Sequence, residues 1–132
     1  MKRTRLTPTS FTPTMGSYSH GIKVNPEGAN WVFVTGQIAM DSNGNVVSND
    51  IETQARFVFE NIKTILFEAG ATMDDVVKAQ IFLTDISDFT KVSLIRNEYF
   101  TNSEPVSTLV QVEALVKKGC KIEVEVIALC DK

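Results

Sequence analysis

Hydrophobic and polar residues alternate in the C-terminal third of the chain. Residues 106–114 follow a period of two, with Ser107 and Leu109 on the face opposite Val106. In the last such segment, the apolar face consists of Ile122, Val124, Val126 and Ala128. Successive side chains of a strand point to opposite faces, so both segments are predicted to be strands. Glu123 lies on the other face of the last strand.

A helical period replaces the alternation between Asn49 and Gly70. Apolar residues recur there at spacings of three and four, which predicts an amphipathic helix. Asn49 and Glu52 resemble a capping box, and Gly70 suits a left-handed C-terminal cap.

A second helix is predicted over residues 88–100, with Ser87 as its N-cap. The side chains expected on its inner stripe are Phe89, Val92, Arg96 and Tyr99.

Residues 31–40 are rich in β-branched and aromatic side chains, which predicts a buried strand. A further strand is expected between the two helices. The order is therefore strands, helix, strand, helix, strands. This order predicts an α+β fold, with two helices packed on one face of a mixed sheet. We expect one domain over residues 1–132, with residues 1–15 as an N-terminal extension.

Composition narrows the class of protein further. The formal net charge of −3 argues against a grip on nucleic-acid phosphates, which needs clustered Lys and Arg. No run of roughly 20 apolar residues suggests a membrane span. The two cysteines, Cys120 and Cys130, flank one predicted strand and are too far apart to pair, which favours a reduced, cytoplasmic setting. One His and two separated Cys give no metal-ligand spacing.

Several segments, in register from about residue 16 to 129, resemble the RidA/YjgF family of small imine-hydrolysing proteins. The segments that carry this resemblance are 16–21 (GSYSHG), 34–38 (VTGQI), 54–56 (QAR), 77–85 (VKAQIFLTD) and 121–125 (KIEVE). The resemblance implies a chorismate-mutase-like fold, a homotrimer and small-molecule pockets between subunits. It also implies hydrolysis of 2-imino or 2-amino-2-enoic acids to 2-keto acids and ammonia, with no metal or organic cofactor.

Carried over by position, the family's pocket residues are Tyr18, Thr35, Gly36, Ser93, Ser107, Leu109 and Glu123. Glu123 matches the glutamate that orients water, and it is the candidate catalytic residue. The alternative for Glu123 is a carboxylate on the solvent face of an edge strand. Tyr18 matches the aromatic that closes the pocket, or it is an ordinary packing residue.

Ser107 stands where the family typically carries an arginine that binds the substrate carboxylate. A guanidinium donates two charge-assisted hydrogen bonds, whereas a hydroxyl offers one neutral bond. Arg96 lies one helical turn after Ser93 and is an alternative anchor. The competing interpretation of Arg96 is a surface or inter-subunit ion pair.

Three hypotheses follow from this departure. The first is an imine hydrolase with an altered substrate and little activity on simple 2-imino acids. The second is a ligand-binding or regulatory protein without deaminase activity. The third is an endoribonuclease or translation inhibitor, following older names in the family; the acidic charge lowers this option.

Overall fold

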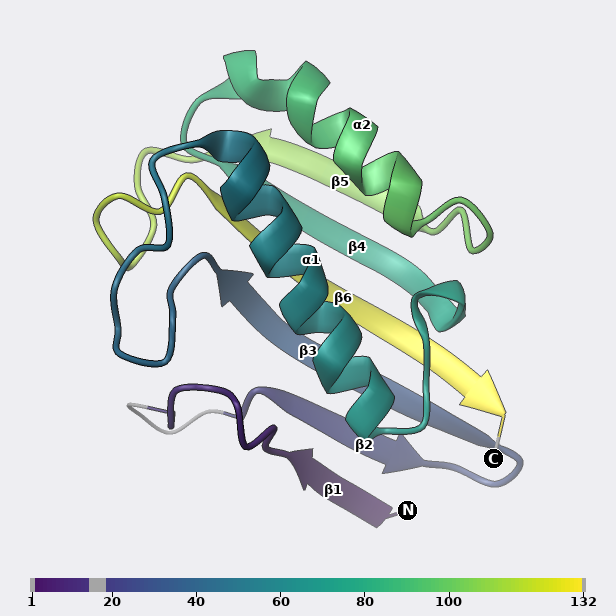
Figure 1. Cartoon of the computed structure of the whole chain (residues 1–132). Coiled ribbons are helices and arrows are strands. Elements are labelled where there is room, and N and C mark those ends of the chain that lie inside the picture. The colour runs from purple at the N-terminus through teal and green to yellow at the C-terminus, as the bar shows by residue number, and fades with distance from the viewer. Residues whose placement is uncertain (1, 15–18, 132) are drawn as a thin grey trace.

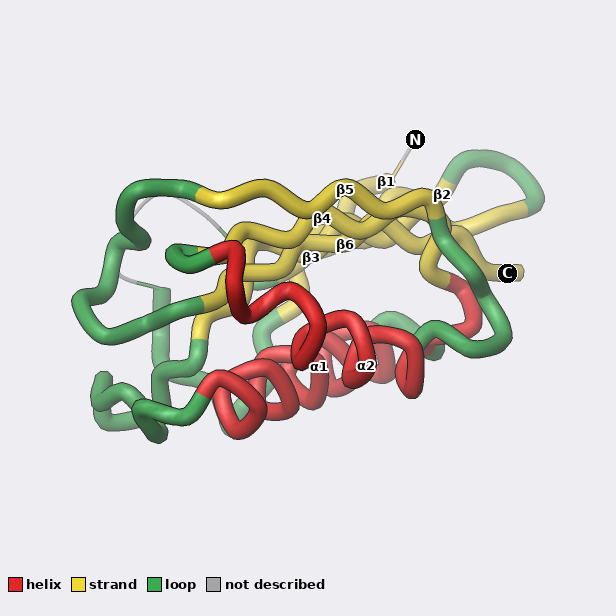
Figure 2. The backbone as a smooth tube through the Cα atoms, turned by 90° about the horizontal axis from the view of Figure 1, so that it is seen from above, coloured by secondary structure: helices red, strands yellow, loops and turns green. Residues whose placement is uncertain are grey.

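Six strands form one mixed sheet, and two helices cover one of its faces (Figures 1 and 2). The computed structural model describes residues 2–14 and 19–131. In chain order the elements are β1 (Lys2–Leu6), β2 (Gly21–Asn25), β3 (Ala29–Ile38), α1 (Ile51–Glu68), β4 (Val76–Leu83), α2 (Phe89–Tyr99), β5 (Val106–Gln111) and β6 (Ile122–Asp131). The predicted α+β architecture is confirmed.

The strand order β1-β2-β3-β6-β4-β5 places the last strand in the middle of the sheet. All neighbouring pairs are antiparallel except β4 and β5, which α2 connects in parallel. The predicted N-terminal extension contributes an edge strand, because β1 pairs with β2. No helix in the described parts of the chain is long and apolar enough to cross a membrane.

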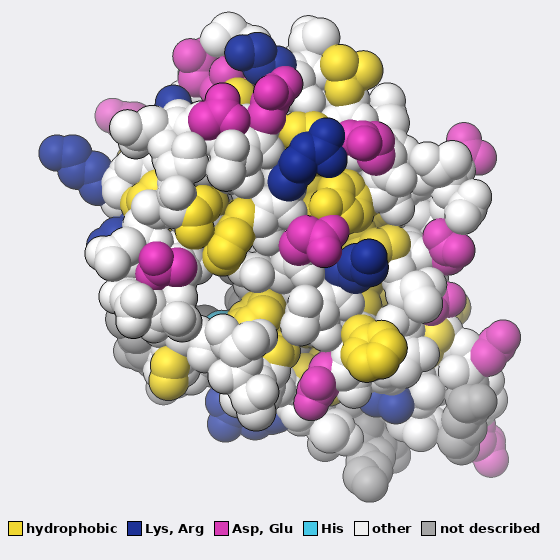
Figure 3. Space-filling model, viewed as in Figure 1, with side chains coloured by type: hydrophobic (Ala, Val, Ile, Leu, Met, Phe, Trp, Pro, Cys, Tyr) yellow, Lys and Arg dark blue, Asp and Glu magenta, His cyan; other side chains and the backbone are white. Residues whose placement is uncertain are grey.

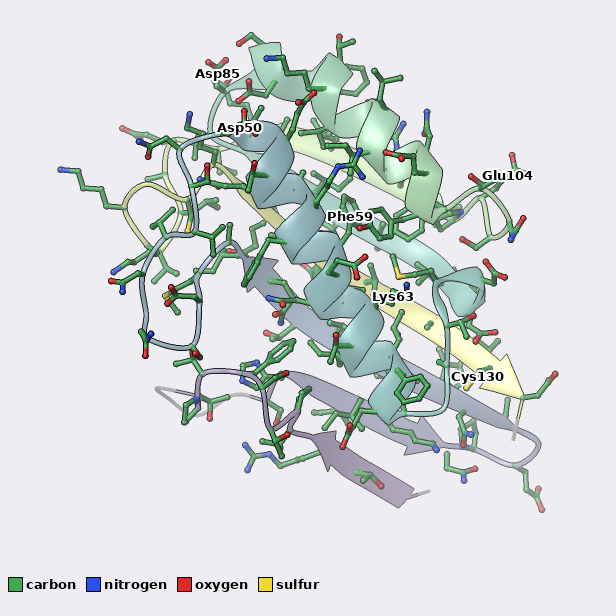
Figure 4. All side chains as sticks on the ribbon, in the orientation of Figure 1. Asp50, Phe59, Lys63, Asp85, Glu104 and Cys130 are labelled. Atoms are coloured by element: carbon green, nitrogen blue, oxygen red, sulfur yellow. The ribbon has the colours of Figure 1, made fainter. Side chains whose placement is uncertain are left out.

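The core lies between α1 and the central strands. Alternation in β6 is confirmed, since Ile122, Val124, Val126 and Ala128 are all buried. From α1, the side chains packed against this face include Val58, Phe59, Ile62, Ile65 and Leu66, each fully buried. Figure 4 shows Phe59 between the two helices, where its ring stacks on that of Tyr99 at a centroid distance of 5.0 Å.

The ends of α1 are set by Asp50 and Gly70. Asp50 is the N-cap, and its carboxylate accepts hydrogen bonds from the amide and the hydroxyl of Thr53 at 2.9 and 2.8 Å. The capping box predicted at Asn49 is therefore wrong by one residue, because the helix begins at Ile51 and Asp50 occupies the N-cap position, three residues before Thr53. Gly70 is confirmed as the left-handed residue, with φ of +79°.

Ser87 is not the N-cap of α2. It lies in a short 3₁₀ turn (Ile86–Asp88), where its amide and hydroxyl donate to the Asp85 carboxylate at 2.9 and 2.7 Å. Asp85 thus caps the turn that leads into α2. Phe89 is 45% exposed, which contradicts its predicted inner position. Val92 is buried as predicted, and Ile95 is the other buried side chain of this helix.

The helix-free face of the sheet carries exposed aromatic residues. In β3, Val32 and Val34 point into the core, but Trp31 and Phe33 are 38% and 40% exposed on the other face. The prediction of a buried strand is therefore correct for one face only. The two rings stack with centroids 6.3 Å apart, and Val110 of β5 adds exposed apolar surface.

Candidate functional site

A break in the pairing of β3 with β6 brings Gly36 against Glu123. Val34 pairs with Val126, but the next regular pair is Gln37 with Val124, so β3 contains one extra residue. Such a bulge redirects side chains and interrupts the ladder of hydrogen bonds. Built onto Gly36, a Cβ atom would collide with the carboxylate of Glu123. Glycine is therefore the residue that leaves room for this carboxylate.

Glu123 occupies a half-buried position on β6. Burial raises the pKa of its carboxyl above the usual 4.5, and the negative charge of Glu125 adds to this effect. Within residues 2–14 and 19–131, no Lys, Arg or His lies within ion-pair distance of this carboxylate. A carboxylate with a raised pKa and no counter-ion can accept a proton from water or hold a water molecule by hydrogen bond.

A cavity of about 570 Å³ contains the Glu123 carboxylate together with Thr35 and Gly36. Its far side is formed by Phe57 and Asn61 of α1. Figure 3 shows a hollow in the helical face of the molecule. This volume lies within the range of small-molecule sites and suits a small metabolite.

The N-terminal segment closes one side of this cavity through His20. The imidazole Nε2 lies 2.9 Å from the carbonyl oxygen of Thr12, and the ring of Phe11 meets it edge-on at 5.1 Å. These contacts hold the His20 side chain in the wall of the cavity. Lys117, on the connection before β6, adds a cation to the lining.

The sequence analysis missed Phe57, Asn61 and Lys117 as cavity residues. Phe57 and Asn61 are four residues apart, a spacing that places them on one side of α1 next to its buried stripe. That spacing could have identified the side of α1 that lines the cavity. Lys117 lies in an irregular connection, where no periodicity marks the direction of a side chain.

Ser107 and Arg96 line a second hollow, of about 520 Å³, between the end of α2 and the start of β5. Arg96 is half-buried in the last turn of α2. Its Nη2 and Nε lie 3.3 and 3.4 Å from the side-chain oxygen of Asn97. Glu104, labelled in Figure 4 beside the end of α2, belongs to the same hollow.

Ser107 and Glu123 lie on strands that flank β4 on either side, at different positions along it. Ser107 pairs with Ala79 in the middle of β4, whereas Glu123 pairs with Phe82 near its end. Because β5 runs parallel and β6 antiparallel to β4, the first residues of β5 and β6 cannot meet within one chain. A single chain therefore brings together Thr35, Gly36 and Glu123, and separately Arg96 and Ser107.

The remaining candidates have other surroundings. Ser93 on α2 has a buried hydroxyl with no hydrogen-bond partner among the described residues. Leu109 is half-buried against the core. Tyr18 lies outside the described residues.

The fold and the half-buried carboxylate define a small α+β protein with a ligand-sized cavity at the edge of a sheet bulge. Comparison with known proteins agrees with this class of protein. The family described as Endoribonuclease L-PSP matches residues 9–130. A RutC family protein of Pyrococcus abyssi is 45% identical over 115 residues, which cover 86% of this chain and 87% of the relative.

Two further relatives are similar along most of the chain. Human 2-iminobutanoate/2-iminopropanoate deaminase is 36% identical over 116 residues, covering 87% of this chain and 81% of the relative. The crystal structure of RidA from an Antarctic Psychrobacter has a TM-score of 0.84 at 34% identity, covering 95% of this chain and 98% of that chain. The chain belongs to the RidA/YjgF family, which the Endoribonuclease L-PSP family model also describes.

Proposed function

We propose that this protein binds small imine- or enamine-type metabolites beside Glu123 and hydrolyses 2-imino acids slowly. The observation that carries the proposal is the Glu123 carboxylate, which is half-buried, lies over Gly36 and has a raised pKa in a metabolite-sized cavity. The human relative named as an imine deaminase supports the reaction class.

In this proposal Glu123 orients and activates the water that attacks the imine carbon. Thr35, which also lines the cavity, offers a hydroxyl that can donate to the ligand or accept from it. Water addition gives a carbinolamine, and loss of ammonia from it gives the 2-keto acid. Glu123 accepts a proton from the water and returns one to the departing nitrogen.

We propose that the working pocket forms between the subunits of a homotrimer. The separation of Glu123 from Ser107 within one chain supports this arrangement, because a neighbouring subunit would bring the second hollow to the first. The exposed Trp31 and Phe33 on the helix-free face support it as well. Contiguous apolar surface of this kind marks protein–protein contacts.

Ser107 is the reason for the slow reaction. Charge-assisted hydrogen bonds contribute roughly 1.5–3 kcal/mol each, against about 1 kcal/mol for neutral bonds. Replacing an arginine fork by a hydroxyl therefore removes several kcal/mol of carboxylate binding. If that binding acts in the transition state, the rate falls by about two to three orders of magnitude.

The same serine favours a second candidate function, a ligand-binding protein with no hydrolysis. This candidate keeps the Glu123 cavity and requires only binding. Ribonuclease activity, which the family description names, is disfavoured by the net charge of −3, since RNA-binding surfaces are basic.

Hydrolysis of 2-iminobutanoate separates these functions. The imine is generated in situ by an amino-acid oxidase, and its disappearance is followed by semicarbazide trapping. We expect slow turnover by the wild type, faster turnover by Ser107→Arg, and loss of both rates when Glu123→Gln is added. If Glu123→Gln leaves both rates unchanged, the proposed role of Glu123 is wrong. If the wild type and Ser107→Arg are both inert but bind 2-oxobutanoate, the ligand-binding function replaces the hydrolase.

A further inference from the structure

From the second hollow we infer that Arg96, together with Ser107, forms a binding site for the carboxylate of the ligand. This inference rests on the proposed function and names the chemical class of its ligand, a small carboxylic acid. Arg96 acts here as a binding and specificity residue on α2, and it restores only part of the carboxylate binding that Ser107 lacks.

The position of the hollow supports this assignment. Arg96 comes from the last turn of α2 and Ser107 from the second residue of β5, and both line one hollow of about 520 Å³. Phe100 and Pro105 provide apolar surface within it. A charged group beside apolar surface is partly desolvated, which strengthens its interaction with an anion.

The guanidinium of Arg96 has unused hydrogen-bonding capacity. Its contacts with the Asn97 oxygen, at 3.3 and 3.4 Å, are longer than typical N–H···O hydrogen bonds. Arg56 behaves differently, because its Nη2 lies 2.8 Å from Glu98 in an ion pair. No such ion pair holds Arg96 in the described part of the chain. Arg96 can therefore present its planar fork to a carboxylate.

Glu104 is the carboxylate that shares this hollow with Arg96. Its backbone has φ of +42°, in the left-handed region, and its amide donates to the carbonyl of Phe100 at 3.0 Å. This turn holds Glu104 in the hollow without an ion pair to Arg96. A ligand carboxylate would therefore meet a cation whose charge is not neutralised by direct contact with a side chain.

Ser107 is smaller than the arginine that the family resemblance leads us to expect at this position. A serine side chain leaves space that an arginine would fill, so the ligand carboxylate reaches toward α2. There the guanidinium of Arg96 can donate two hydrogen bonds and the Ser107 hydroxyl one. A single carboxylate has about four acceptor positions and can therefore accept all three of these hydrogen bonds.

Binding of 2-oxobutanoate to the assembled protein tests the inference, with 2-oxobutanamide as the uncharged probe. NMR titration gives Kd for the wild type, Arg96→Gln, Arg96→Lys and Arg56→Gln. We expect Arg96→Gln to weaken 2-oxobutanoate binding about tenfold or more, with no change for the amide. Arg96→Lys keeps the charge but loses the fork, so its Kd should fall between the two. Arg56→Gln removes a guanidinium elsewhere and should bind like the wild type.

The outcomes distinguish this inference from the function on which it rests. Equal Kd values for the wild type, Arg96→Gln and Arg96→Lys would overturn the assignment of Arg96, while Glu123-dependent hydrolysis would still support the proposed function. A wild type that binds neither probe and does not hydrolyse the imine would overturn both. If Arg96→Gln does not fold by circular dichroism, Arg96→Lys decides, and wild-type affinity for 2-oxobutanoate in that variant contradicts a bidentate site.

Discussion

The carboxylate of Glu123 occupies the space that a Cβ atom on residue 36 would need. This relationship joins the bulge in β3 to the candidate catalytic group on β6. Gly36 does not have a positive φ, so its backbone conformation does not require glycine. The requirement for glycine at this position arises from the Glu123 side chain, which supplies the three atoms nearest to the added Cβ.

Gly36→Ala should therefore displace the Glu123 carboxylate and abolish its function with a small effect on stability. The added methyl group meets a side chain and not backbone, so we expect a loss of about 1 kcal/mol in the free energy of unfolding. A double-mutant cycle with Glu123→Ala measures the coupling by urea denaturation. In the Glu123→Ala protein, Gly36→Ala should cost almost nothing. Equal costs in both backgrounds would show that the two residues do not interact.

Stability should depend on pH through Glu123. Its pKa is raised in the folded protein, so ionisation is more costly in the folded than in the unfolded state. This penalty is absent below the usual value of 4.5 and grows as pH rises through the raised value. Glu123→Gln removes the penalty, so we expect its Tm to exceed that of the wild type at pH 7 and to match it at pH 4.

Glu125→Gln is the comparison for this pH effect. It removes the negative charge that helps to raise the pKa of Glu123, and it keeps the Glu123 carboxyl. The pH midpoint of Glu123-dependent hydrolysis should move toward acid in this variant. The same midpoint in wild type and variant would contradict the electrostatic account.

Gln54 should contribute strongly to stability because it is fully buried and bonded to three backbone groups. Its side-chain amide donates to the carbonyl oxygens of Ser48 and Gly119 at 2.7 and 2.9 Å and accepts from the amide of Lys121 at 2.7 Å. Gln54→Ala should lower the free energy of unfolding by about 3 kcal/mol. Urea denaturation measures this loss.

The control for Gln54 is Gln111→Ala. Gln111 is exposed and accepts one hydrogen bond, from the amide of Ile86 at 2.8 Å. Its replacement should cost less than about 1 kcal/mol. Similar losses in the two variants would mean that burial of the Gln54 network contributes little.

Phe33→Asp should dissociate the proposed trimer. A charge placed on the apolar, helix-free face would be buried unpaired at a subunit interface, which costs several kcal/mol. Light scattering coupled to size-exclusion chromatography measures the mass, and the variant should elute as a monomer. Phe67→Asp is the matched control, because Phe67 is 77% exposed at the end of α1. Unchanged mass in Phe33→Asp would show that this face is not the interface.

The helices and strands were predictable from the local sequence pattern, but the burial of some side chains and the position of the N-cap were not. In β6 each side chain follows a period of two, so burial could be inferred from the sequence. In β3 the apolar run has no polar face, and sequence alone cannot distinguish a core side chain from one such as Trp31, which is exposed on the sheet. The N-cap was misplaced because Asp50 and Asn49 are both good caps. Only the position of Thr53 decides between them.

The family resemblance singles out Thr35, Gly36 and Glu123, whose role stays a prediction, but their arrangement could not be inferred from the sequence. The bulge that places Gly36 on Glu123 depends on the register of β3 with β6, and those strands are far apart in sequence. The separation of Glu123 from Ser107 follows from the strand order and from the directions of β5 and β6 relative to β4. Neither relationship has a local signature in the chain.

The most direct test of the account is whether Glu123 and Arg96 act from different subunits. Glu123→Gln and Arg96→Gln proteins are unfolded, mixed in equal amounts and refolded, and imine hydrolysis is compared with that of each variant alone. In random trimers with one site per interface, about a quarter of the sites would contain both Glu123 and Arg96. The hydrolysis rate of the mixture should therefore exceed that of each variant alone and approach about a quarter of the wild-type rate. Hydrolysis equal to the average of the two variants would contradict a pocket shared between subunits.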